Sequence, residues 1–447
     1  MFDNLIDERR IGRRQAIIFA LCLIVLIIDG MDFQLLAFVS PVLLVDWKIT
    51  KAQLAPALAA ALFGMAIGAA TGGLAGDRFG CRRVLTVVVA LFGVATLATA
   101  LVTGVSQLVV LRFLSGFGFG VAVPTAMALA SEWCPKIRRG QLVVLMSIGT
   151  MAGGTLGGVI AAWLIPAFGW HSIFLVSGGF TLLCAALSTL YLPESLSFLQ
   201  RKGRDREARA WVARILERTT VVARPVVVEP DEEAAPADAG SRLLSSANLR
   251  VNIGLWIGFF AIAYASFAYM SWTPAVLVAS GFSLLAAIKC TSIYTLSAAA
   301  GVVACACCLP RFGSRLLLVG SLGMTIAATF ALPSLLATGP AATGAVSIAM
   351  FVVGFGGGMS TSTSYALAAM AYPARHRSTG MGFCIGLSRA GGICSVLSGG
   401  IQLEMGGPGG RIFFTVVGCF VIVGAVGLAI VNRHIGARLV AGRVALP

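Results

Sequence analysis

Residues 53–85 decide the fold of this chain, and they read QLAPALAAALFGMAIGAATGGLAGDRFGCRRVL. The segment 53–76 carries no charged side chain and is long enough for a helix to cross a bilayer, at about 1.5 Å per residue. Charged residues then gather in the short loop from Asp77 to Arg83 before apolar sequence resumes at Val84. Two apolar segments joined by a short basic loop predict a helical hairpin within a membrane.

Apolar segments of this kind recur along the whole chain. Hydrophobic residues make up 58% of its 447 residues and charged residues only 11%, whereas a soluble domain has about 25% charged residues. Each segment must be helical, because hydrocarbon offers no hydrogen-bond partner to an open backbone. The segments of spanning length are 15–45, 53–76, 84–104, 107–131, 141–167, 171–192, 251–280, 284–309, 315–337, 341–371, 379–402 and 411–431. We therefore predict an all-α membrane protein with twelve transmembrane helices in two pseudo-symmetric six-helix bundles.

A polar stretch between the sixth and seventh segments divides the chain. It predicts an N-terminal six-helix bundle over residues 1–192, a cytoplasmic central loop over 193–249, and a C-terminal bundle with a short cytoplasmic tail over 250–447. Within the loop, the many charges of 196–220 favour a short amphipathic helix. The segment 221–240 is rich in Pro, Ala and acidic residues, which is typical of a linker.

The basic residues indicate the orientation. The net charge is +15, but Lys and Arg cluster between apolar segments, which is a topology signal and argues against nucleic-acid binding. With the N-terminus in the cytoplasm, nearly all Lys and Arg residues of the loops face the cytoplasm. The exceptions are Lys48, Lys51, Lys289 and Arg411. We expect a multi-pass protein of the bacterial inner membrane with both termini in the cytoplasm.

The two halves carry related loops. DRFGCRRVL at 77–85 is matched by PRFGSRLLL at 310–318, and PKIRRG at 135–140 is matched by PARHRSTG at 373–380. Six-helix halves that repeat in parallel about an axis along the membrane normal place a binding site between them, near the midplane. The repeat therefore predicts a transporter with a central site.

Several segments resemble a known family. GLAGDRFGCRR at 73–83 is similar to the signature loop of the major facilitator superfamily, and DGMD at 29–32 resembles the Asp-Gly-x-Asp signature of its aromatic acid:proton symporter family. Further blocks similar to that family are RFLSGFGFGVAVPTAMALASEWCPKIRRG at 112–140, LPESLSFL at 192–199 and YPARHRSTGMGFCIGLSRAGG at 372–392. The resemblance covers nearly the whole chain outside 220–248. It implies uptake of a small aromatic carboxylate, such as benzoate, a hydroxybenzoate or protocatechuate, together with protons.

Two positions depart from the signature loop. Cys81 stands where the first copy usually has Arg or Lys, and Pro310 stands where the second copy often keeps Asp. We expect the second loop to hold its half less firmly, or the gating balance to differ.

Asp29 and Asp32 are the candidate proton-coupling residues. They lie three residues apart, so both point to one face of a helix. A carboxylate within a span is costly and persists only with a partner, a cavity or a proton. Adjacent carboxylates also raise each other's proton affinity, which suits proton coupling. The alternative is a structural pair bonded to neighbouring helices.

Arg389 and Arg112 are the candidate substrate-binding cations. Arg389 lies well inside its apolar segment, and a guanidinium fork matches a carboxylate. Arg112 lies near the start of its segment, before three closely spaced glycines. It would bind substrate or link the proton site to gating, unless it extends to the outer interface. For Arg389 the alternative is an ion pair with Asp29 or Asp32.

Aromatic side chains are expected to surround the ring of the substrate. Tyr264 and Phe33 are the first candidates, and Tyr264 shares one helix face with Phe267. Further candidates on the same reasoning are Phe267, Trp272, Tyr294 and Phe355.

The signature loop is assigned to gating. The resemblance implies that Asp77 holds the first half against the N-terminus of the eleventh helix, where a carboxylate meets the positive end of the helix dipole. This contact would stabilise the state that is open to the outside. Arg78, Arg82 and Arg83 complete the loop.

Other charged residues near the helix ends are expected to support the gate. Glu132 ends the fourth segment and would join the network with Arg138 and Arg139, while Glu194 ends the sixth segment. Both glutamates are interpreted as cytoplasmic latches. Glu404, near the outer end of the eleventh segment, is expected to be solvated.

Neither a cofactor nor a metal is expected. The chain has three scattered histidines, no Gly-Lys-Ser or Gly-Lys-Thr phosphate loop and no nucleophile motif, which argues against an enzyme and against a primary pump. We predict a monomeric secondary transporter whose partners are a small aromatic carboxylate, protons and the lipid bilayer. The alternatives are a proton-driven exporter of aromatic or drug-like solutes, an importer of a non-aromatic organic acid such as muconate, and a non-transporting membrane sensor.

Overall fold

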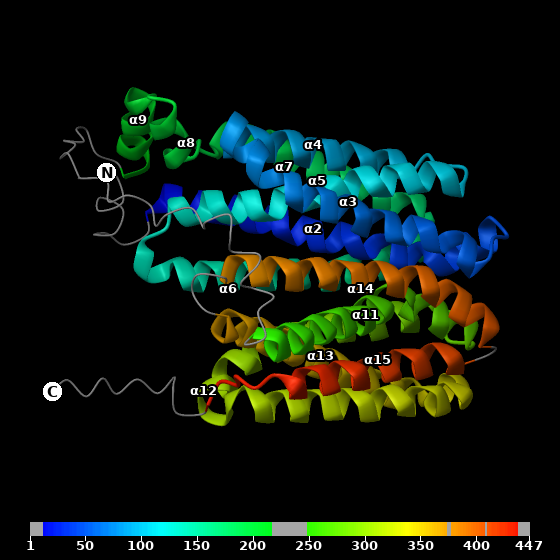
Figure 1. Cartoon of the computed structure of the whole chain (residues 1–447). Helices are drawn as coiled ribbons and strands as arrows, with labels where there is room; N and C mark the ends of the chain where they lie inside the picture. Colours follow the sequence, from blue (N-terminus) through cyan, green and yellow to red (C-terminus); the bar gives the residue numbers. More distant parts are fainter. Residues whose placement is uncertain (1–11, 217–247, 373–376, 407–408, 437–447) are drawn as a thin grey trace. The chain divides into compact units, whose positions relative to one another are not determined.

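The computed structural model describes residues 12–216, 248–372, 377–406 and 409–436, and these contain helices and no strands. The chain divides into two compact units (Figure 1). Unit 1 comprises Met1–Leu35 and Ala60–Pro230, and unit 2 comprises Leu36–Ala59 and Asp231–Pro447. The predicted linker 221–240 lies outside the described residues.

The helices follow the apolar segments of the sequence closely. The first part of the chain forms α2 (Arg13–Asp46), α3 (Lys51–Phe79), α4 (Cys81–Thr99), α5 (Val105–Glu132), α6 (Lys136–Phe168), α7 (His171–Tyr191), α8 (Leu196–Arg201) and α9 (Asp205–Leu216). The second part forms α11 (Leu249–Ala279), α12 (Leu284–Ala337), η2 (Gly339–Ala342), α13 (Thr343–Ala371), α14 (Arg377–Met405) and α15 (Arg411–Ile430). Eleven helices in the described ranges are long and apolar enough to span a membrane. One of them, α12, contains 54 residues and counts as two spans, because its backbone is not helical at Gly313. The predicted twelve-span, all-α architecture is confirmed.

The repeated RFG sequence folds in the same way in both units. Gly80, which precedes α4, has φ of 94°, and Gly313, which divides α12, has φ of 72°. Only glycine adopts this region without strain, because it has no Cβ atom. The glycine therefore turns the chain between two antiparallel spans in each unit.

Glycines also allow two helices to pack backbone against backbone within each unit. In unit 1, a Cβ atom added to Gly68 of α3 would overlap the carbonyl oxygen of Phe117, and one added to Gly120 of α5 would overlap that of Met65. Small residues are the usual means of close approach between membrane helices, since lipid is as apolar as the helix surface. The α3–α5 pair therefore depends on the absence of side chains along its contact line.

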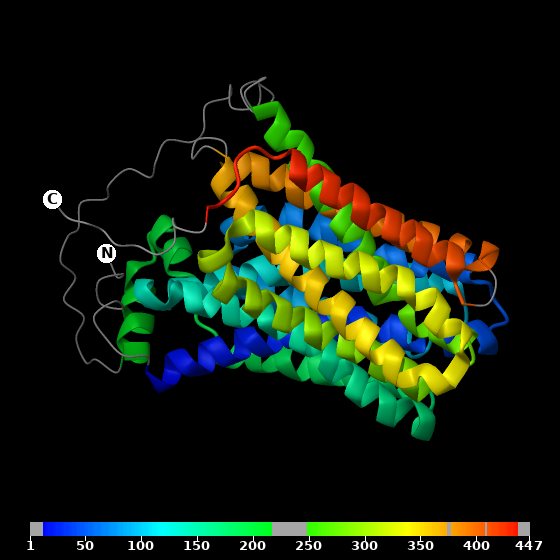
Figure 2. The ribbon, with the colours of Figure 1, turned by 90° about the horizontal axis from the view of Figure 1, so that it is seen from below.

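The corresponding helices of unit 2 also pack backbone against backbone at glycines. A Cβ atom added to Gly301 of α12 would overlap the carbonyl oxygen of Phe355, and one added to Gly358 of α13 would overlap that of Ala298. Both views show α12 and α13 side by side (Figures 1 and 2). The second and fourth spans of each bundle thus pair in the same manner, which is the pseudo-symmetry that the repeated loops predict.

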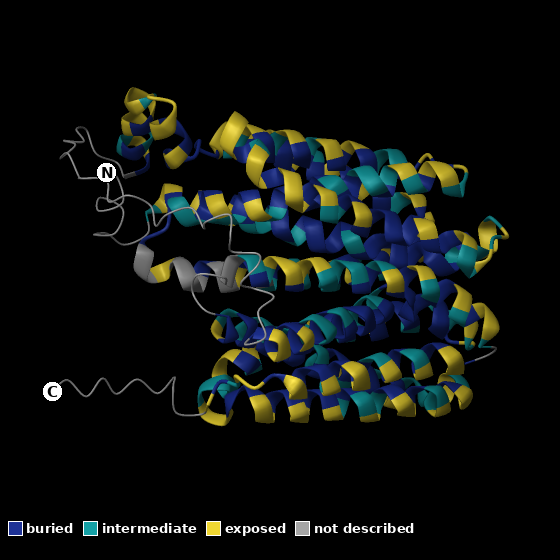
Figure 3. Cartoon of the chain, viewed as in Figure 1, coloured by how far each residue is buried: buried dark blue, intermediate teal, exposed yellow. Residues whose placement is uncertain are grey.

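The outer faces of the spans are apolar and exposed, as membrane helices require. Exposed large side chains include Leu74, Trp163 and Leu190, and exposed residues alternate with buried ones along the helices (Figure 3). A soluble protein does not expose large apolar side chains in such numbers. These faces are therefore interpreted as lipid-facing.

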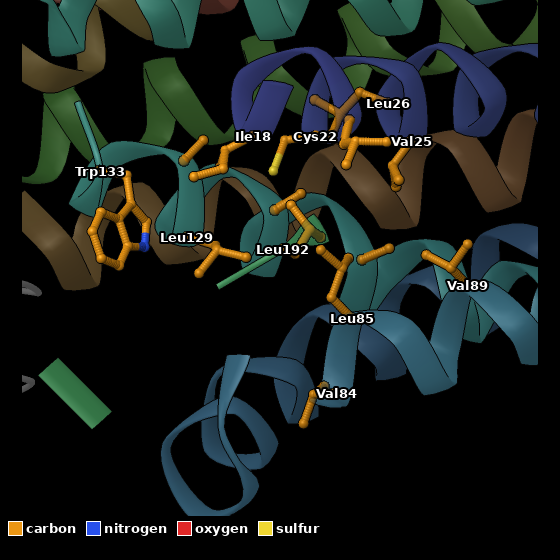
Figure 4. Packing of buried hydrophobic residues seen from close by; sticks show 14 of the residues in the cluster. Ile18, Cys22, Val25, Leu26, Val84, Leu85, Val89, Leu129, Trp133 and Leu192 are labelled. Carbon is orange, nitrogen blue, oxygen red and sulfur yellow. The ribbon is translucent and has the colours of Figure 1, made fainter. Parts of the chain in front are cut away.

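Residues 196–220 were expected to form one amphipathic helix, but the structure has two short ones. Gly203, with φ of 67°, separates α8 from α9. Ala208, Val212 and Ile215 of α9 are buried against unit 1 and belong to the same apolar cluster as Leu192 and the residues shown in Figure 4. The segment after the sixth span is therefore packed as part of unit 1.

We expect Gly68→Val to destabilise the protein strongly, because the added side chain meets backbone that cannot move aside. Overpacking a well-packed contact costs about 1–3 kcal/mol even where side chains can adjust. Gly73→Val is the matched control, since Gly73 lies on the same helix with nothing within 4 Å of an added Cβ atom. Thermal unfolding of both variants in detergent measures the difference. Equal melting temperatures would refute the backbone-contact interpretation.

Candidate functional site

Asp32 of α2 is fully buried in unit 1, and both of its carboxylate oxygens have partners. Thr96 Oγ1 of α4 donates a hydrogen bond to Oδ1 at 2.7 Å. Arg112 Nη1 of α5 lies 3.2 Å from Oδ2 and forms an ion pair with it. A buried charge is tolerated only when it is paired and hydrogen-bonded in this way. One of the two candidate protonation residues and one of the two candidate substrate cations are thus brought together.

Arg112 of α5 makes further contacts with α2, α4 and α7 of unit 1. Its Nη2 atom donates to Thr99 Oγ1 of α4 at 3.3 Å, and its Nη1 atom lies 3.4 Å from the backbone oxygen of Asp32. Its guanidinium carbon lies 5.4 Å from the ring centroid of Phe174 on α7, a cation–π distance. The side chain is 1% exposed, so it does not extend to an interface. Arg112 has two predicted roles, substrate binding and a link between the proton site and gating. Its ion pair with Asp32 favours the second.

Asp29 lies one helical turn before Asp32 and is also buried, with 4% of its surface exposed. Gly30, between the two carboxylates, brings the backbone of α2 against that of α6, because a Cβ atom there would overlap the carbonyl oxygen of Thr150. Phe33 follows Asp32 and is half-buried in unit 1. The acidic pair therefore sits where α2 is held tightly by its neighbours.

We expect Arg112→Ala to cost about 3–5 kcal/mol of stability, because it leaves the Asp32 charge buried without its cation. The double variant Asp32→Asn with Arg112→Gln removes both charges and should recover much of that loss. Arg209→Ala, an exposed position on α9, is the control. Thermal unfolding of the wild-type protein, Asp32→Asn, Arg112→Gln and the double variant forms a double-mutant cycle, and Arg112→Ala and Arg209→Ala are measured beside it. Additive losses would show that the ion pair contributes no coupling energy.

Unit 2 contains a cavity of about 200 Å³ that includes Arg389. Three helices line it at helical spacing, so that each contributes one face. Its lining residues are Phe259, Ile262, Ala263, Ser266 and Phe267 of α11, Thr361, Ser364 and Tyr365 of α13, and Ser388 and Arg389 of α14.

The cavity combines one cation with aromatic and hydroxyl-bearing walls. Arg389 is half-buried and lines the cavity together with Tyr365. The Tyr365 ring meets Phe259 edge to face, with centroids 4.9 Å apart and planes at 82°. A fixed aromatic wall beside a guanidinium can hold a planar anion through its charge and its ring together.

Tyr264 lies on α11 close to this cavity in sequence but is engaged elsewhere. Its hydroxyl lies 2.8 Å from Ser398 Oγ and accepts a hydrogen bond from Gln402 Nε2 at 2.8 Å. Its ring stacks on Phe420 at 3.8 Å. Among the aromatic candidates, Phe267 lines the cavity, whereas the role predicted for Tyr264 rests on its sequence position alone.

The residues of the signature loop bind to the α8–α9 segment within unit 1. Asp77 accepts a hydrogen bond from Arg201 Nη2 of α8 at 2.8 Å, in an exposed ion pair. The Asp77 carboxylate raises the pKa of the Arg201 guanidinium by this bond. Arg82 donates to the carbonyl oxygen of Thr189, and its guanidinium carbon lies 5.8 Å from the Trp211 ring centroid of α9. The loop is thereby tied to the end of the sixth span.

Arg78, Arg83 and Arg138 are exposed. Arg78 lies over the ring of the adjacent Phe79 at 5.4 Å. These three side chains remain gating candidates by prediction, since their geometry matches solvated topology charges equally well.

Glu132 and Glu194 cap helices. Glu132 accepts hydrogen bonds from the Leu196 N–H at 2.8 Å and from the hydroxyls of Ser195 and Ser197 at 2.9 and 2.6 Å, at the start of α8. Glu194 accepts from the Arg82 N–H at 2.9 Å, at the start of α4. A carboxylate at a helix N-terminus meets unsatisfied N–H groups and the positive end of the dipole.

Glu404 is exposed, as expected of a solvated residue, but it also caps a helix. Its Oε1 atom accepts a hydrogen bond from the Ala52 N–H at 2.8 Å, at the start of α3 and within unit 2. The last turn of α14 is therefore bonded to the first turn of α3. Three widely separated glutamates thus perform the same structural task.

The second copy of the loop is held by neutral hydrogen bonds. Ser314, directly after Gly313, donates its N–H to the Ile435 oxygen at 3.0 Å and accepts the Ile435 N–H on its hydroxyl at 2.9 Å. The same hydroxyl lies 3.3 Å from His434 Nδ1. The segment after the last span thus holds the second loop, as Glu194 after the sixth span holds the first.

Sequence reasoning missed the polar face of α13. Thr361 and Ser364 line the cavity, and they belong to the run STSTS at 360–364 inside an apolar span. Hydroxyls on a membrane helix can bond to their own backbone, as Ser364 does to the Ser360 oxygen at 2.8 Å. The signal was therefore present, but it is also typical of a structural helix.

We expect Asp77→Asn to change the free energy of unfolding by less than about 1 kcal/mol, because the ion pair with Arg201 is exposed. If the pair acts in gating, the transport rate of the variant should nevertheless fall more than tenfold. Arg201→Ala should reproduce that fall. Transport rates and melting temperatures of both variants test whether the pair acts in gating. Normal transport by both variants would exclude Asp77 and Arg201 from the gate.

The apolar helices of the described residues, with a buried ion pair in one unit and a cavity that includes Arg389 in the other, are typical of a polytopic membrane protein that handles a small solute. Residues 22–383 match the model of the Major Facilitator Superfamily. The 4-hydroxybenzoate transporter PcaK of Acinetobacter baylyi is 32% identical over 95% of this chain and 92% of its own length. The gallate transporter of Pseudomonas putida is 32% identical over 96% and 94%. The chain belongs to the major facilitator superfamily and to its family of aromatic acid transporters.

Solved structures agree on the fold. The xylose transporter XylE of E. coli, in a partially occluded inward open conformation, superposes with a TM-score of 0.72 at 18% identity and covers 95% of this chain and 99% of its own. A bacterial homolog of the human lysosomal transporter Spinster gives a TM-score of 0.70 at 15% identity, over 94% of this chain and 96% of its own. At these identities the likeness extends to the fold alone.

Proposed function

We propose that this protein takes up a small aromatic carboxylate together with protons across the bacterial inner membrane, with both termini in the cytoplasm. The observation that carries the proposal is Arg389, set beside Tyr365, Phe259 and Phe267 in one cavity of unit 2. The guanidinium supplies the charge for a carboxylate and the rings supply a wall for an aromatic solute. Two relatives are named as transporters of 4-hydroxybenzoate and of gallate, and these names support the same class of solute, an aromatic carboxylate.

The size of the cavity favours a single ring. Its volume of about 200 Å³ lies below the roughly 300–1,000 Å³ of sites that hold drug-sized ligands. A cation also disfavours neutral or positively charged drugs. The two features argue for a monocyclic acid over the drug-like solutes of an exporter.

Asp32 is the proposed proton carrier of unit 1, with Asp29 as its neighbour. In the ionised form Asp32 pairs with Arg112 at 3.2 Å. Protonation would cancel the carboxylate charge and remove the attraction that holds Arg112 and Thr96 in place. Protonation thereby favours a different arrangement of α2, α4 and α5. In this proposal the proton alters the packing of the unit as well as its charge.

Arg389 acts in the proposal as the anion site, and neutralisation by the bound carboxylate lowers the cost of enclosing it. In the proposal a proton on Asp32 releases the ion pair of unit 1, and the carboxylate of the acid adds a negative charge beside Arg389. Alternating access then needs both events before the loaded protein rearranges. Asp77, which bonds to Arg201 within unit 1, remains the proposed gating residue, and its predicted contact with the N-terminus of the eleventh helix is the one that breaks in that step.

Uptake by proteoliposomes tests the proposal. With an imposed pH gradient, alkaline inside, the wild-type protein should accumulate labelled 4-hydroxybenzoate, and collapse of the gradient should abolish accumulation. Asp32→Asn should lose accumulation but keep counterflow exchange, because the cavity of unit 2 is intact. If that variant does not fold, the neutral double variant Asp32→Asn with Arg112→Gln replaces it. Uptake that ignores the gradient would exclude proton symport.

Arg389→Ala should weaken binding of 4-hydroxybenzoate by about tenfold or more, since a hydrogen bond to a charged group contributes about 1.5–3 kcal/mol. Arg411→Ala, which removes an exposed arginine outside the cavity, is the matched control. Titration calorimetry of the purified proteins gives both affinities. Equal affinities in the two variants would place the acid elsewhere.

A further inference from the structure

Two hydroxyl-bearing side chains of α13 share the cavity with Arg389 and have no part in the function proposed above. Ser364 and Thr361 lie three residues apart on one helix face, and both line the cavity. Ser364 is 2% exposed and Thr361 is half-buried. They are polar groups that α13 contributes to the wall, which also contains Ser266 of α11 and Ser388 of α14.

The hydrogen bond of Ser364 fixes what its oxygen can offer. A serine hydroxyl has one proton to donate and two lone pairs that accept. Ser364 donates that proton to the Ser360 oxygen of its own helix, at 2.8 Å. The Ser364 oxygen can therefore only accept a further hydrogen bond. A solute in the cavity forms that bond only if it donates a proton to it.

The donor on such a solute must belong to its ring substituents. An ionised carboxylate donates nothing, and Arg389 in the same cavity is the matching partner for it. A ring C–H donates only weakly. A phenolic hydroxyl is a strong donor, and a benzene ring holds it at a fixed distance from the carboxylate.

We propose that Ser364, assisted by Thr361, is a specificity residue that favours aromatic acids with a ring hydroxyl over those without one. The proposal rests on the function given above, since it presumes that Arg389 holds the carboxylate. A site built to accept a substrate hydroxyl rejects the analogue that lacks it, because the buried acceptor then loses its partner.

The neighbouring position on α13 offers a matched control. Thr363 is fully buried and bonds to the Met359 oxygen at 2.7 Å, and its hydroxyl lies 3.2 Å from Cys305 Sγ of α12. It carries the same kind of hydroxyl on the same helix but is absent from the cavity lining. Thr363→Val therefore tests the general effect of losing a helix hydroxyl.

The test is titration calorimetry with three probes, namely benzoate, 3-hydroxybenzoate and 4-hydroxybenzoate. The wild-type protein should bind at least one hydroxylated acid about tenfold more tightly than benzoate. Ser364→Ala should reduce that ratio by about threefold to tenfold while it changes benzoate affinity less than twofold. Thr361→Val should act in the same direction, and Thr363→Val should preserve the ratio. If Ser364→Ala does not fold, Thr361→Val and Ser364→Thr, which keeps the acceptor, supply the comparison.

The outcomes separate the two proposals. If the wild-type protein binds none of the acids, the proposed function fails and the specificity role fails with it. If the acids bind through Arg389 but the wild-type ratio is near one, or Ser364→Ala weakens all three probes equally, only the specificity role is overturned.

Discussion

The ion pair between Asp32 and Arg112 is the interaction on which unit 1 depends. It joins α2 to α5 at 3.2 Å, while Thr96 and Thr99 add α4 and the Phe174 ring adds α7. In water such a pair would contribute little, but at 0–2% exposure neither charge can be left alone without a large penalty. Four spans thus meet at one ion pair. In the proposed function, protonation of Asp32 changes their arrangement because it removes this attraction.

The charged side chains inside the two units have different surroundings. Unit 1 pairs its acid with its own arginine, whereas Arg389 of unit 2 borders a cavity lined by hydroxyls and aromatic rings. A guanidinium that lines a cavity can meet a solute there, whereas the Asp32–Arg112 pair is buried. The pseudo-symmetric fold therefore does not imply symmetric chemistry. The two units share their glycine turns and helix contacts, but they differ in the placement of their ionisable side chains.

The sequence predicted the spans well because hydrocarbon permits only helices, so that hydropathy alone nearly fixes their limits. The break at Gly313 could likewise be placed from the RFG repeat. Side-chain partners were harder to predict. Arg112 was considered as a substrate ligand, and its pairing with Asp32 follows from the way α2, α4 and α5 pack, which no local pattern encodes. The cavity face of α13 was missed for a related reason: STSTS places hydroxyls on every side of a helix, and only tertiary packing selects Thr361 and Ser364 for the cavity.

Glutamates outside the ion pair show why charge alone does not identify a proton carrier. Glu132, Glu194 and Glu404 each accept a backbone N–H at the first turn of a helix, at 2.8–2.9 Å. The bond from the Ala52 N–H holds the pKa of Glu404 below its usual value. A carboxylate that meets the unsatisfied N–H groups at a helix start has a structural task there. Asp32 instead has side-chain partners from two other helices, Thr96 and Arg112, and in the proposed function a proton competes with Arg112 for it.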